Sequence, residues 1–423
     1  MIEISRIREQ KDEVVNGLKV RGLDVATEVE QILNLDKQWR TKKQEMDSAL
    51  AEMNQISKEI GQLFQQGKKD EAEAAKQKTG ELKERSQTLK TEFSDLEKQI
   101  NDLLLNIPNV PNKLVPEGAT EDDNEVVFEK GTIPTFDFNA LPHWDLATKY
   151  DIIDWEMGVK VTGAGFPFYK NQGARLQRGL INFFLDEAIK AGYSEYVPPF
   201  VINEDSGYGT GQLPDKEGQM YQVTADNLYL IPTSEVPLVN TLRGDRVKKE
   251  DLPIKLTAYS PCFRREAGSY GKDVRGLNRL HQFDKVELVM ASDQESSYQE
   301  LDKMVEHVKG LLEKLELPYR ILRLCGGDLG VTAAITYDFE VYSTAQERWL
   351  EISSCSNVET YQANRMKLRY KDEEGNTKLC HTLNGSALAL PRVIAGILEN
   401  HQDANGINMP KALVPYVGFE RIQ

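Results

Sequence analysis

Two neighbouring segments, YSPCFRRE at residues 259–266 and LNRLHQFDKVE at residues 277–287, decide the fold of the larger part of this chain. Both are typical of strands, and residues two apart along a strand share one face of a sheet. A hairpin of the two segments therefore gathers cationic, aromatic and acidic side chains on a common surface. That surface comprises Arg264, Glu266, Arg279, His281, Phe283, Lys285 and Glu287.

This surface predicts a site for a ligand that carries phosphate groups and a base. Guanidinium groups pair with phosphate oxygens in bidentate fashion, and Phe283 offers a ring on which a base can stack. The alternative is a solvated hairpin held by alternating salt bridges. The Gly-rich stretch 267–276 predicts a long mobile loop between the strands, which favours the functional interpretation.

The surrounding sequence predicts an α+β domain built on a mostly antiparallel sheet. Apolar spacing predicts helices over residues 176–189, 293–315 and 387–400. The Gly-rich stretch 207–211 lacks the spacing of a nucleotide-binding loop and is expected to be a mobile loop. Strands are expected over residues 193–202, 319–324, 337–343 and 348–353, the first interrupted by Pro198 and Pro199.

The N-terminal part predicts a long helical hairpin. Apolar residues recur in alternating steps of three and four over residues 46–63 and 75–103, with a polar turn between them at 65–70. This is the spacing of a coiled-coil seam, and the short turn makes the two helices antiparallel. The hairpin is expected over about residues 28–105. Prolines after residue 106 then predict a linker, so the expected domains are 1–110 and 111–423.

Charge and composition exclude several functions. The chain has 52 basic and 67 acidic residues and a net charge of −15, which argues against a general binder of polyanions. No apolar run is long enough for a transmembrane helix, and the N-terminus lacks the pattern of a signal peptide. The four cysteines form no C-x-x-C pair, so reduced thiols in the cytoplasm are expected.

The hairpin itself leaves two functions open. Residues 1–110 hold 18 basic and 21 acidic residues, a net charge of −3, against −12 for the remainder. A basic cluster on the first helix and two lysines at the tip could meet a phosphate backbone. From the arm alone, a dimerisation or scaffolding coiled coil is favoured. The cations concerned are Lys37, Arg40, Lys42, Lys43, Lys68 and Lys69.

Three segments carry a resemblance to a known class of enzymes. Residues 263–283 resemble motif 2 of the class II aminoacyl-tRNA synthetases, residues 192–201 resemble motif 1, and residues 385–392 resemble motif 3. The N-terminal hairpin and the segments 233–235, 351–357 and 381–386 occur in the order typical of the bacterial type of the seryl-tRNA synthetase family. The resemblance covers nearly the whole chain. It implies a helical tRNA-binding arm, a class II catalytic domain and a homodimer whose interface includes Pro199.

The resemblance also implies a reaction and an ATP site. Serine and ATP would form seryl-adenylate, and the seryl group would pass to serine tRNA, with magnesium bound by Glu351 and Ser354. The catalytic residues would be Arg264, on the α-phosphate, and Arg392, on the outer phosphate near the adenine. No general base is needed, because the nucleophile is already a carboxylate. The implied ATP-binding residues are Arg264, Glu266, Arg279, Phe283, Glu351, Ser354 and Arg392.

The serine pocket follows from the same resemblance. Thr233 and Glu287, with Glu235 beside them, would hold the ammonium, and Asn384 and Ser386 the hydroxyl. A pocket that hydrogen-bonds the substrate hydroxyl rejects alanine, while threonine must be refused by shape. The alternative for Glu287 is a strand carboxylate paired with a nearby lysine, although its context in motif 2 favours the ligand role.

The resemblance gives the arm a partner, the long variable arm of serine tRNA, recognised by shape and backbone. Selenocysteine tRNA is a further expected substrate where an organism has one. Two other functions stay open at this point. A synthetase-like ligase could charge a carrier protein, which the intact arm disfavours. A coiled-coil scaffold could carry an inactive catalytic domain, which the retained arginines and glutamates disfavour.

Overall fold

The computed structural model describes residues 1–266 and 275–423, and these residues divide into two compact units. Unit 1 comprises Met1–Lys19 and Leu23–Pro108, and unit 2 comprises Val20–Gly22 and Asn109–Gln423. Most of the predicted Gly-rich loop at 267–276 lies outside the described residues. Within them, no helix is long and apolar enough to cross a membrane.

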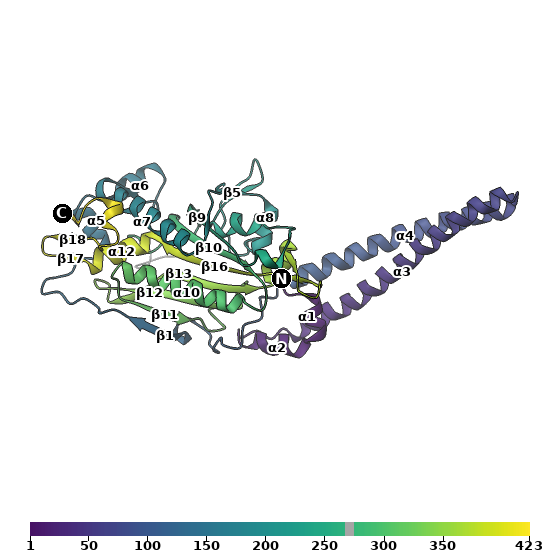
Figure 1. Ribbon diagram of the computed structural model, residues 1–423, viewed down its shortest axis with the longest axis horizontal. Helices are drawn as coiled ribbons and strands as arrows, with labels where there is room; N and C mark the ends of the chain where they lie inside the picture. Colours follow the sequence, from purple (N-terminus) through teal and green to yellow (C-terminus); the bar gives the residue numbers. More distant parts are fainter. Residues whose placement is uncertain (267–274) are drawn as a thin grey trace. The chain divides into compact units, whose positions relative to one another are not determined.

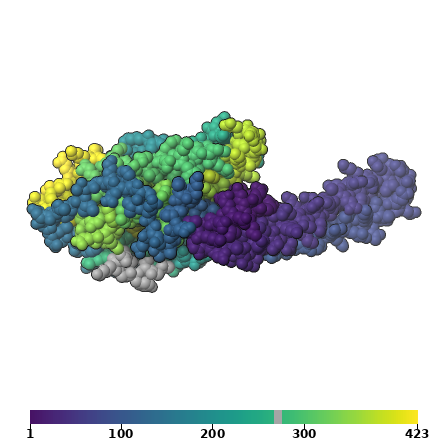
Figure 2. Space-filling view, turned by 90° about the horizontal axis from the view of Figure 1, so that it is seen from below, coloured from purple at the N-terminus to yellow at the C-terminus, as the bar shows by residue number. Residues whose placement is uncertain are grey.

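Unit 1 is a helical hairpin on a small helical base. Two short helices are followed by two long antiparallel ones that lie side by side in Figure 1, so the predicted hairpin is confirmed. The longer of these has 40 residues and extends about 60 Å at 1.5 Å per residue. In Figure 2 the darkest purple residues form the thickest part of the unit. The helices are α1 (Ile4–Glu9), α2 (Lys11–Lys19), α3 (Ala26–Gln65) and α4 (Lys69–Leu104).

The seam of the hairpin consists of apolar contacts bordered by ion pairs. Ile56 and Leu82 are buried between the two helices, as the heptad spacing predicts, and Ala49, which lies outside the predicted seam, is buried with them. Trp39 stacks on Phe93 with ring centroids 4.8 Å apart. Opposite charges add contacts across the seam, with N–O distances of 2.8 Å for Lys42–Glu92 and 2.7 Å for Lys78–Glu52.

Several cations of the predicted basic cluster have partners within unit 1. Arg40 lies 2.9 Å from the buried carboxylate of Asp36, and Lys43 lies 5.3 Å from the centroid of the Trp39 ring. Lys42 is paired with Glu92 across the seam. The cluster is therefore less of an open basic track than the sequence alone indicates.

Unit 2 is built on an antiparallel sheet of eight strands within the described residues, and only β4 runs parallel to its neighbour. This confirms the predicted fold class. In the order of the sheet, the strands are β1 (Glu125–Lys130), β11 (Tyr319–Arg323), β12 (Ile335–Ser343), β13 (Arg348–Glu359), β16 (His381–Ala389), β10 (Gln282–Ser292), β9 (Ile254–Phe263) and β4 (Ser194–Glu195).

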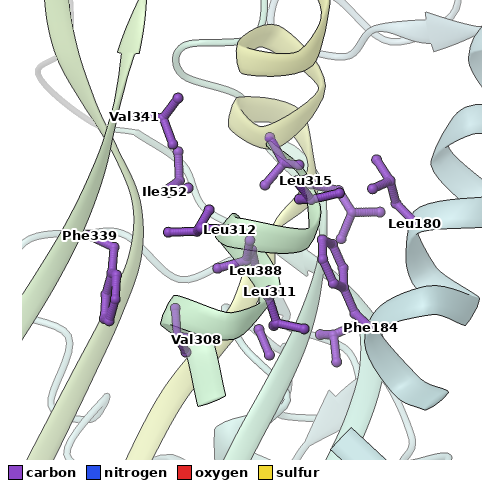
Figure 3. Close-up of a cluster of buried hydrophobic side chains, with 14 of the residues drawn as sticks. Leu180, Phe184, Val308, Leu311, Leu312, Leu315, Phe339, Val341, Ile352 and Leu388 are labelled. Carbon is purple, nitrogen blue, oxygen red and sulfur yellow. The ribbon is translucent and has the colours of Figure 1, made fainter. Parts of the chain in front are cut away.

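Helices α7, α10 and α12 pack on this sheet and share one hydrophobic core with it. Figure 3 shows part of this core, where Leu180 and Phe184 of α7 lie close to Leu311 and Leu312 of α10 and to Leu388 of β16. The helices of unit 2 are α5 (His143–Lys149), α6 (Trp155–Val161), α7 (Asn171–Lys190), α8 (Glu204–Thr210), α9 (Glu235–Asn240), α10 (Ser297–Lys314), α11 (Tyr361–Met366), α12 (Leu390–Asn400) and α13 (Val414–Val417), with short 3-10 turns at Glu121–Asp123 and Lys249–Asp251.

Short strands form four small sheets around the main one. One sheet pairs β2 (Ile153–Asp154) with β3 (Phe168–Tyr169), and a second has β7 (Leu228–Leu230) between β5 (Val201–Ile202) and β6 (Gln222–Val223). A third has β14 (Arg369–Lys371) between β8 (Arg246–Val247) and β15 (Thr377–Leu379). The fourth has β18 (Gly406–Asn408) between β17 (Gln402–Asp403) and β19 (Arg421–Ile422).

Two local predictions were wrong. The stretch 207–211 is not a loop, because α8 runs through it and ends at Gly211, whose φ of 93° is left-handed. Asn203 caps this helix by accepting the amide hydrogen of Ser206. The last helix begins at Leu390 instead of residue 387, since Ala389 still pairs with Lys285 in the sheet.

Candidate active site

The centre of the sheet forms the floor of the candidate site. β10 lies between β9 and β16, and Phe263 of β9 pairs with Gln282, as the sequence predicts for the two segments. Alternation along β10 places Phe283 and Glu287 on one face. Glu287 has Ser386 of β16 as its neighbour across the strands, so the motif 2 and motif 3 segments meet here.

One end of this face carries a guanidinium next to an aromatic ring. Arg264 follows β9 directly, and its backbone amide donates to the carbonyl oxygen of His281 at 2.9 Å. Its guanidinium carbon lies 5.2 Å from the centroid of the Phe283 ring. Arg265 points elsewhere, over the ring of Tyr221, as strand alternation predicts. The structure thus brings together a cation and a stacking surface of the predicted ATP site.

Glu266 and Arg279 form an ion pair with each other, through Arg279 Nε and a carboxylate oxygen. Glu266 has a left-handed φ of 49°, which turns the chain immediately after β9. Both residues were predicted to contact ATP. In the structure their charges compensate each other.

Arg392 lies in the first turn of α12 and contacts one strand and the segment before another. Its Nη1 donates to the carbonyl oxygen of Glu351 at 2.5 Å and lies 3.4 Å from a carboxylate oxygen of the same residue. Its Nε donates to the carbonyl oxygen of Asn278 at 3.1 Å. The motif 3 arginine is therefore held between β13 and the segment that leads into β10.

Glu351 and Ser354 lie on β13 near a third oxygen donor, Asp338 of β12. Asp338 is the direct neighbour of Ser354 across the strands and is hydrogen-bonded to it. Burial, and after it the charge of Glu351, raises the pKa of Asp338 well above its ordinary value. Its Oδ1 is buried without a hydrogen-bond partner. This region therefore concentrates hard oxygen donors, and burial disfavours the charged form of one of them, Asp338.

The other end of the β10 face carries a cluster of buried polar and acidic side chains. Thr233 donates from Oγ1 to Glu287 Oε2 at 3.0 Å and accepts the amide hydrogen of Glu235 at 3.1 Å. Gln362 Nε2 donates to Glu235 Oε1 at 2.7 Å. The side chain of Asn384 also hydrogen-bonds Glu235. Four of the five predicted serine-binding residues are thus connected by hydrogen bonds.

The two carboxylates of the pocket differ in their surroundings. Burial, followed by the charge of Glu287, raises the pKa of Glu235 above its usual range. Glu287 instead has a cation beside it, since Lys285 Nζ lies 2.6 Å from Glu287 Oε2 and both side chains are buried. The lysine pairing considered for Glu287 on sequence grounds is therefore present. It does not exclude a ligand role, because the pair borders the pocket.

The remaining predicted residues lie in separate places. Ser386 is buried on β16, and its carbonyl oxygen accepts a hydrogen bond from Ser353 Oγ at 2.5 Å. Pro199 lies far along the chain from these residues, exposed between β4 and β5. It stands next to exposed apolar side chains, with Val197 87% and Phe200 39% exposed.

Sequence reasoning missed Gln362 and Asp338 and gave Lys285 no role. Lys285 was predicted on the correct face of its strand, and the signal that could have identified it is its place two residues from Glu287. Gln362 and Asp338 carry no comparable signal. Their importance depends on contacts with residues far away in the sequence, Glu235 and Ser354.

Comparisons with known proteins agree with this geometry. Residues 1–111 match the seryl-tRNA synthetase N-terminal domain, and residues 220–401 match the class II tRNA synthetase core domain of the G, H, P, S and T enzymes. The serine–tRNA ligase of Salinibacter ruber is 49% identical, over 100% of this chain and 99% of that protein.

Solved structures are similar over the whole length. The seryl-tRNA synthetase of Pyrococcus horikoshii, complexed with ATP, has a TM-score of 0.91 at 35% identity, covering 100% of this chain and 99% of that one. The cytoplasmic serine–tRNA ligase of Naegleria fowleri, in complex with AMP, has a TM-score of 0.87 at 27% identity with the same coverage. The chain therefore belongs to the seryl-tRNA synthetase family of class II aminoacyl-tRNA synthetases, the enzymes that ligate serine to tRNA.

Proposed function

We propose that seryl-adenylate forms along one face of β10, between a cationic end that binds ATP and an acidic end that binds serine. The observation that carries this proposal is the spacing of two groups on that strand. Phe283, with the guanidinium of Arg264 over its ring, lies four residues from Glu287, which accepts from Thr233. A nucleotide stacked at one end thus has its α-phosphate within reach of an amino acid held at the other.

The three arginines of the proposed ATP site bind two different phosphates of the nucleotide. Arg264 binds the α-phosphate and offsets the repulsion between the attacking carboxylate and the phosphate. Arg279 and Arg392 bind the outer phosphate, once Arg279 leaves its ion pair with Glu266. Glu266 is then free to accept hydrogen bonds from the nucleotide. Arg279 stays paired with an anion in this exchange, because the outer phosphate replaces the Glu266 carboxylate at its guanidinium.

The oxygen donors of β13 fit a magnesium ion. Within the described residues no three His, Cys, Asp or Glu side chains are arranged around a single cation. Magnesium commonly uses only one or two carboxylates and completes its shell with water and substrate phosphates, so Glu351 and Ser354 suffice. A bound cation would favour the charged form of the buried Asp338 carboxyl nearby, whose Oδ1 has no hydrogen-bond partner. The ion would supply charge neutralisation for the phosphates when bound.

The serine zwitterion exchanges partners with a buried ion pair. The ammonium binds Glu287, Thr233 and Glu235, and Lys285, displaced from Glu287, is then available to the serine carboxylate. Asn384 and Ser386 bind the hydroxyl. The serine carboxylate is the nucleophile, so no side chain has to remove a proton before attack on the α-phosphate.

The helical hairpin of unit 1 binds the tRNA substrate, at the long variable arm of serine tRNA. Recognition through shape and backbone suits an arm whose net charge is slightly negative. We extend the proposal to selenocysteine tRNA where an organism has one. The exposed apolar residues beside Pro199 support a homodimer formed through this segment. The cytoplasm is the proposed location, because protein synthesis consumes the product there.

Charging assays with serine, alanine and threonine test the function. We expect serine to be attached to tRNA with a kcat/KM about 10⁴-fold above that for alanine, since alanine leaves the hydroxyl-binding groups unpaired. Threonine should also be a poor substrate. ATP–pyrophosphate exchange without any charging of tRNA would favour a carrier-protein ligase, and no serine-dependent exchange by folded protein would indicate an inactive scaffold.

The pH dependence of serine binding tests the role of Glu235. Burial raises the pKa of the Glu235 carboxyl group above the ordinary glutamate value of about 4.3. Before serine binds, Glu235 therefore stays protonated to a higher pH than an exposed glutamate. The ammonium binds the charged form, so the KM for serine should fall as pH rises through that pKa, by up to about tenfold per pH unit.

Glu235→Gln is the matched variant for this titration, since it keeps the hydrogen-bonding shape and cannot ionise. We expect a higher KM for serine with little slope over the range in which the serine amine stays protonated. Measurement of exchange rates against pH at saturating ATP checks this. An unchanged slope in the variant would show that another group titrates.

A further inference from the structure

The segment that leads into β10 is held from outside the motifs that bind substrates. Leu277 and Asn278 begin this segment, and the carbonyl oxygen of Asn278 accepts from Arg392 Nε. Arg279 comes next and pairs with Glu266. Two of the three arginines proposed to bind ATP therefore depend on where this short segment lies.

A buried histidine fixes the backbone of this segment. His143, at the start of α5, is 0% exposed, and its Nε2 accepts the amide hydrogen of Leu277 at 2.8 Å. Because a backbone amide can only donate, Nε2 carries no proton, and the ring proton lies on Nδ1. Nδ1 is 2.7 Å from Glu399 Oε1 and donates to it. The carboxylate thus sets the tautomer that the backbone of Leu277 requires.

Backbone and side-chain packing make this contact specific. A Cβ atom on Gly276 would lie 2.3 Å from His143 Nε2, so glycine permits the close approach of chain and ring. Gly276 also has a left-handed φ of 65°. The guanidinium carbon of Arg275 lies 4.6 Å from the centroid of the ring of Trp144. Both residues before Leu277 are therefore fitted to α5.

Glu399 reaches the same segment by a second route. It lies on α12, seven residues after Arg392, and its Oε2 accepts from Ser343 Oγ. The Ser343 hydroxyl oxygen accepts the amide hydrogen of Gln346 at 3.2 Å. The side chain of Gln346 accepts from Asn278 Nδ2 at 3.0 Å. One carboxylate therefore connects α5, the turn after β12 and the entry to β10.

The charge of Glu399 is compensated by these contacts. Burial acts to raise its pKa, but hydrogen bonds from the side chain and backbone of His143 and from Ser343 outweigh burial and leave the pKa lowered. A buried carboxylate with several donors is a rigid element, because loss of any donor leaves an unpaired charge. Such a carboxylate can fix the positions of the residues that donate to it.

We propose that His143 and Glu399 are positioning residues for ATP binding, which fix the Leu277–Asn278 backbone and through it the guanidinium of Arg392. The inference rests on the proposed role of Arg392 as a ligand of ATP. Neither residue touches the nucleotide. They act on the geometry of the motif 2 and motif 3 arginines in the way that outer-shell groups orient the ligands of a metal.

Two variants of His143 separate positioning from simple packing. In His143→Gln the amide oxygen extends to about the place of Nε2 and can accept from Leu277. In His143→Asn the amide nitrogen lies near the place of Nδ1 and can donate to Glu399, but Leu277 loses its acceptor. We expect the KM for ATP to rise about 10–100-fold in the Asn variant, to stay close to the original in the Gln variant, and the KM for serine to change little in either.

The measurement is serine-dependent ATP–pyrophosphate exchange, normalised to active sites counted by a burst of adenylate formation, so that misfolded molecules do not contribute. Gln346→Ala tests the second route, with loss of one long hydrogen bond (3.5 Å) to Glu399 Oε1, and should also raise the KM for ATP. His401→Asn is the control, since the ring of this half-buried histidine hydrogen-bonds the backbone oxygen of Leu315, at 2.9 Å, and no residue of the proposed ATP site. Its KM for ATP should not change.

Equal KM values for ATP in the Asn and Gln variants would overturn the inference, whether both rise or neither does. So would an effect of His401→Asn as large as that of His143→Asn. The proposed function fails separately. If Arg392→Ala leaves the KM for ATP unchanged, the ligand role of Arg392 is wrong, whereas a strong effect of Arg392→Ala with none from His143→Asn rejects only the positioning role.

Discussion

Replacing Arg264 by alanine is expected to lower the rate of serine-dependent ATP–pyrophosphate exchange by about 10³-fold. The reason is electrostatic. Attack by a carboxylate on the α-phosphate brings two anions together, and the guanidinium above Phe283 is positioned to compensate them. Alanine removes this charge and the bidentate donor geometry together.

The fold should survive this change. The contact that anchors the backbone of Arg264 is its amide hydrogen on the carbonyl of His281, which alanine retains. Circular dichroism, thermal unfolding and sizing of the oligomer serve as controls and should match the original protein. Arg264→Lys keeps a charge without the planar fork and should give an intermediate rate. Near-normal exchange by Arg264→Ala would refute the α-phosphate role.

Removing the distal hairpin is expected to separate the two steps of the reaction. Deletion of residues 45–88, with a short Gly-Ser connection, keeps the stacked pair Trp39–Phe93 and the ion pair Lys42–Glu92. Adenylate formation should be nearly unchanged, because the proposed ATP and serine residues all belong to unit 2. Charging of tRNA should fall by about 10²-fold or more, since positioning of the acceptor end is lost.

Exchange and charging are measured on the same preparation, so that the ratio of the two rates is independent of the amount of active enzyme. A variant with Lys68 and Lys69 changed to alanine tests whether the tip alone contributes. If both reactions fall together in the deletion variant, the hairpin supports the catalytic unit instead of binding tRNA.

Periodic features of the fold were predictable from sequence, and features made by distant contacts were not. The seam of the hairpin follows from a spacing of seven residues, and the faces of β9 and β10 follow from a spacing of two residues. Both spacings can be read from the sequence without knowledge of tertiary contacts. The segment 207–211 was mistaken for a loop because glycine is a poor helix former. In the fold, Gly207 and Gly209 are buried, and their missing side chains allow α8 to approach its neighbours closely.

The candidate site shows the same division. Arg264, Phe283 and Glu287 could be grouped from two strands, because alternation fixes their faces. No spacing connects His143 with Leu277 or Glu399, which are more than a hundred residues away from it. The Glu266–Arg279 pair was not predicted, and a lysine was considered as the partner of Glu287 without being named. Sequence motifs indicate which groups bind a substrate, but they do not say which of these groups pair with one another in the fold.

In the proposed binding mode, Lys285 competes with the ammonium group of the amino acid for Glu287. The amino acid must first break this buried contact, so its affinity would be a difference between two sets of ion pairs. An amine without a carboxylate would leave Lys285 uncompensated, and an acid without an amine would leave Glu287 uncompensated. A molecule with both charges would restore the balance on each side. The pair would thereby select for an α-amino acid independently of the side chain that the amino acid carries.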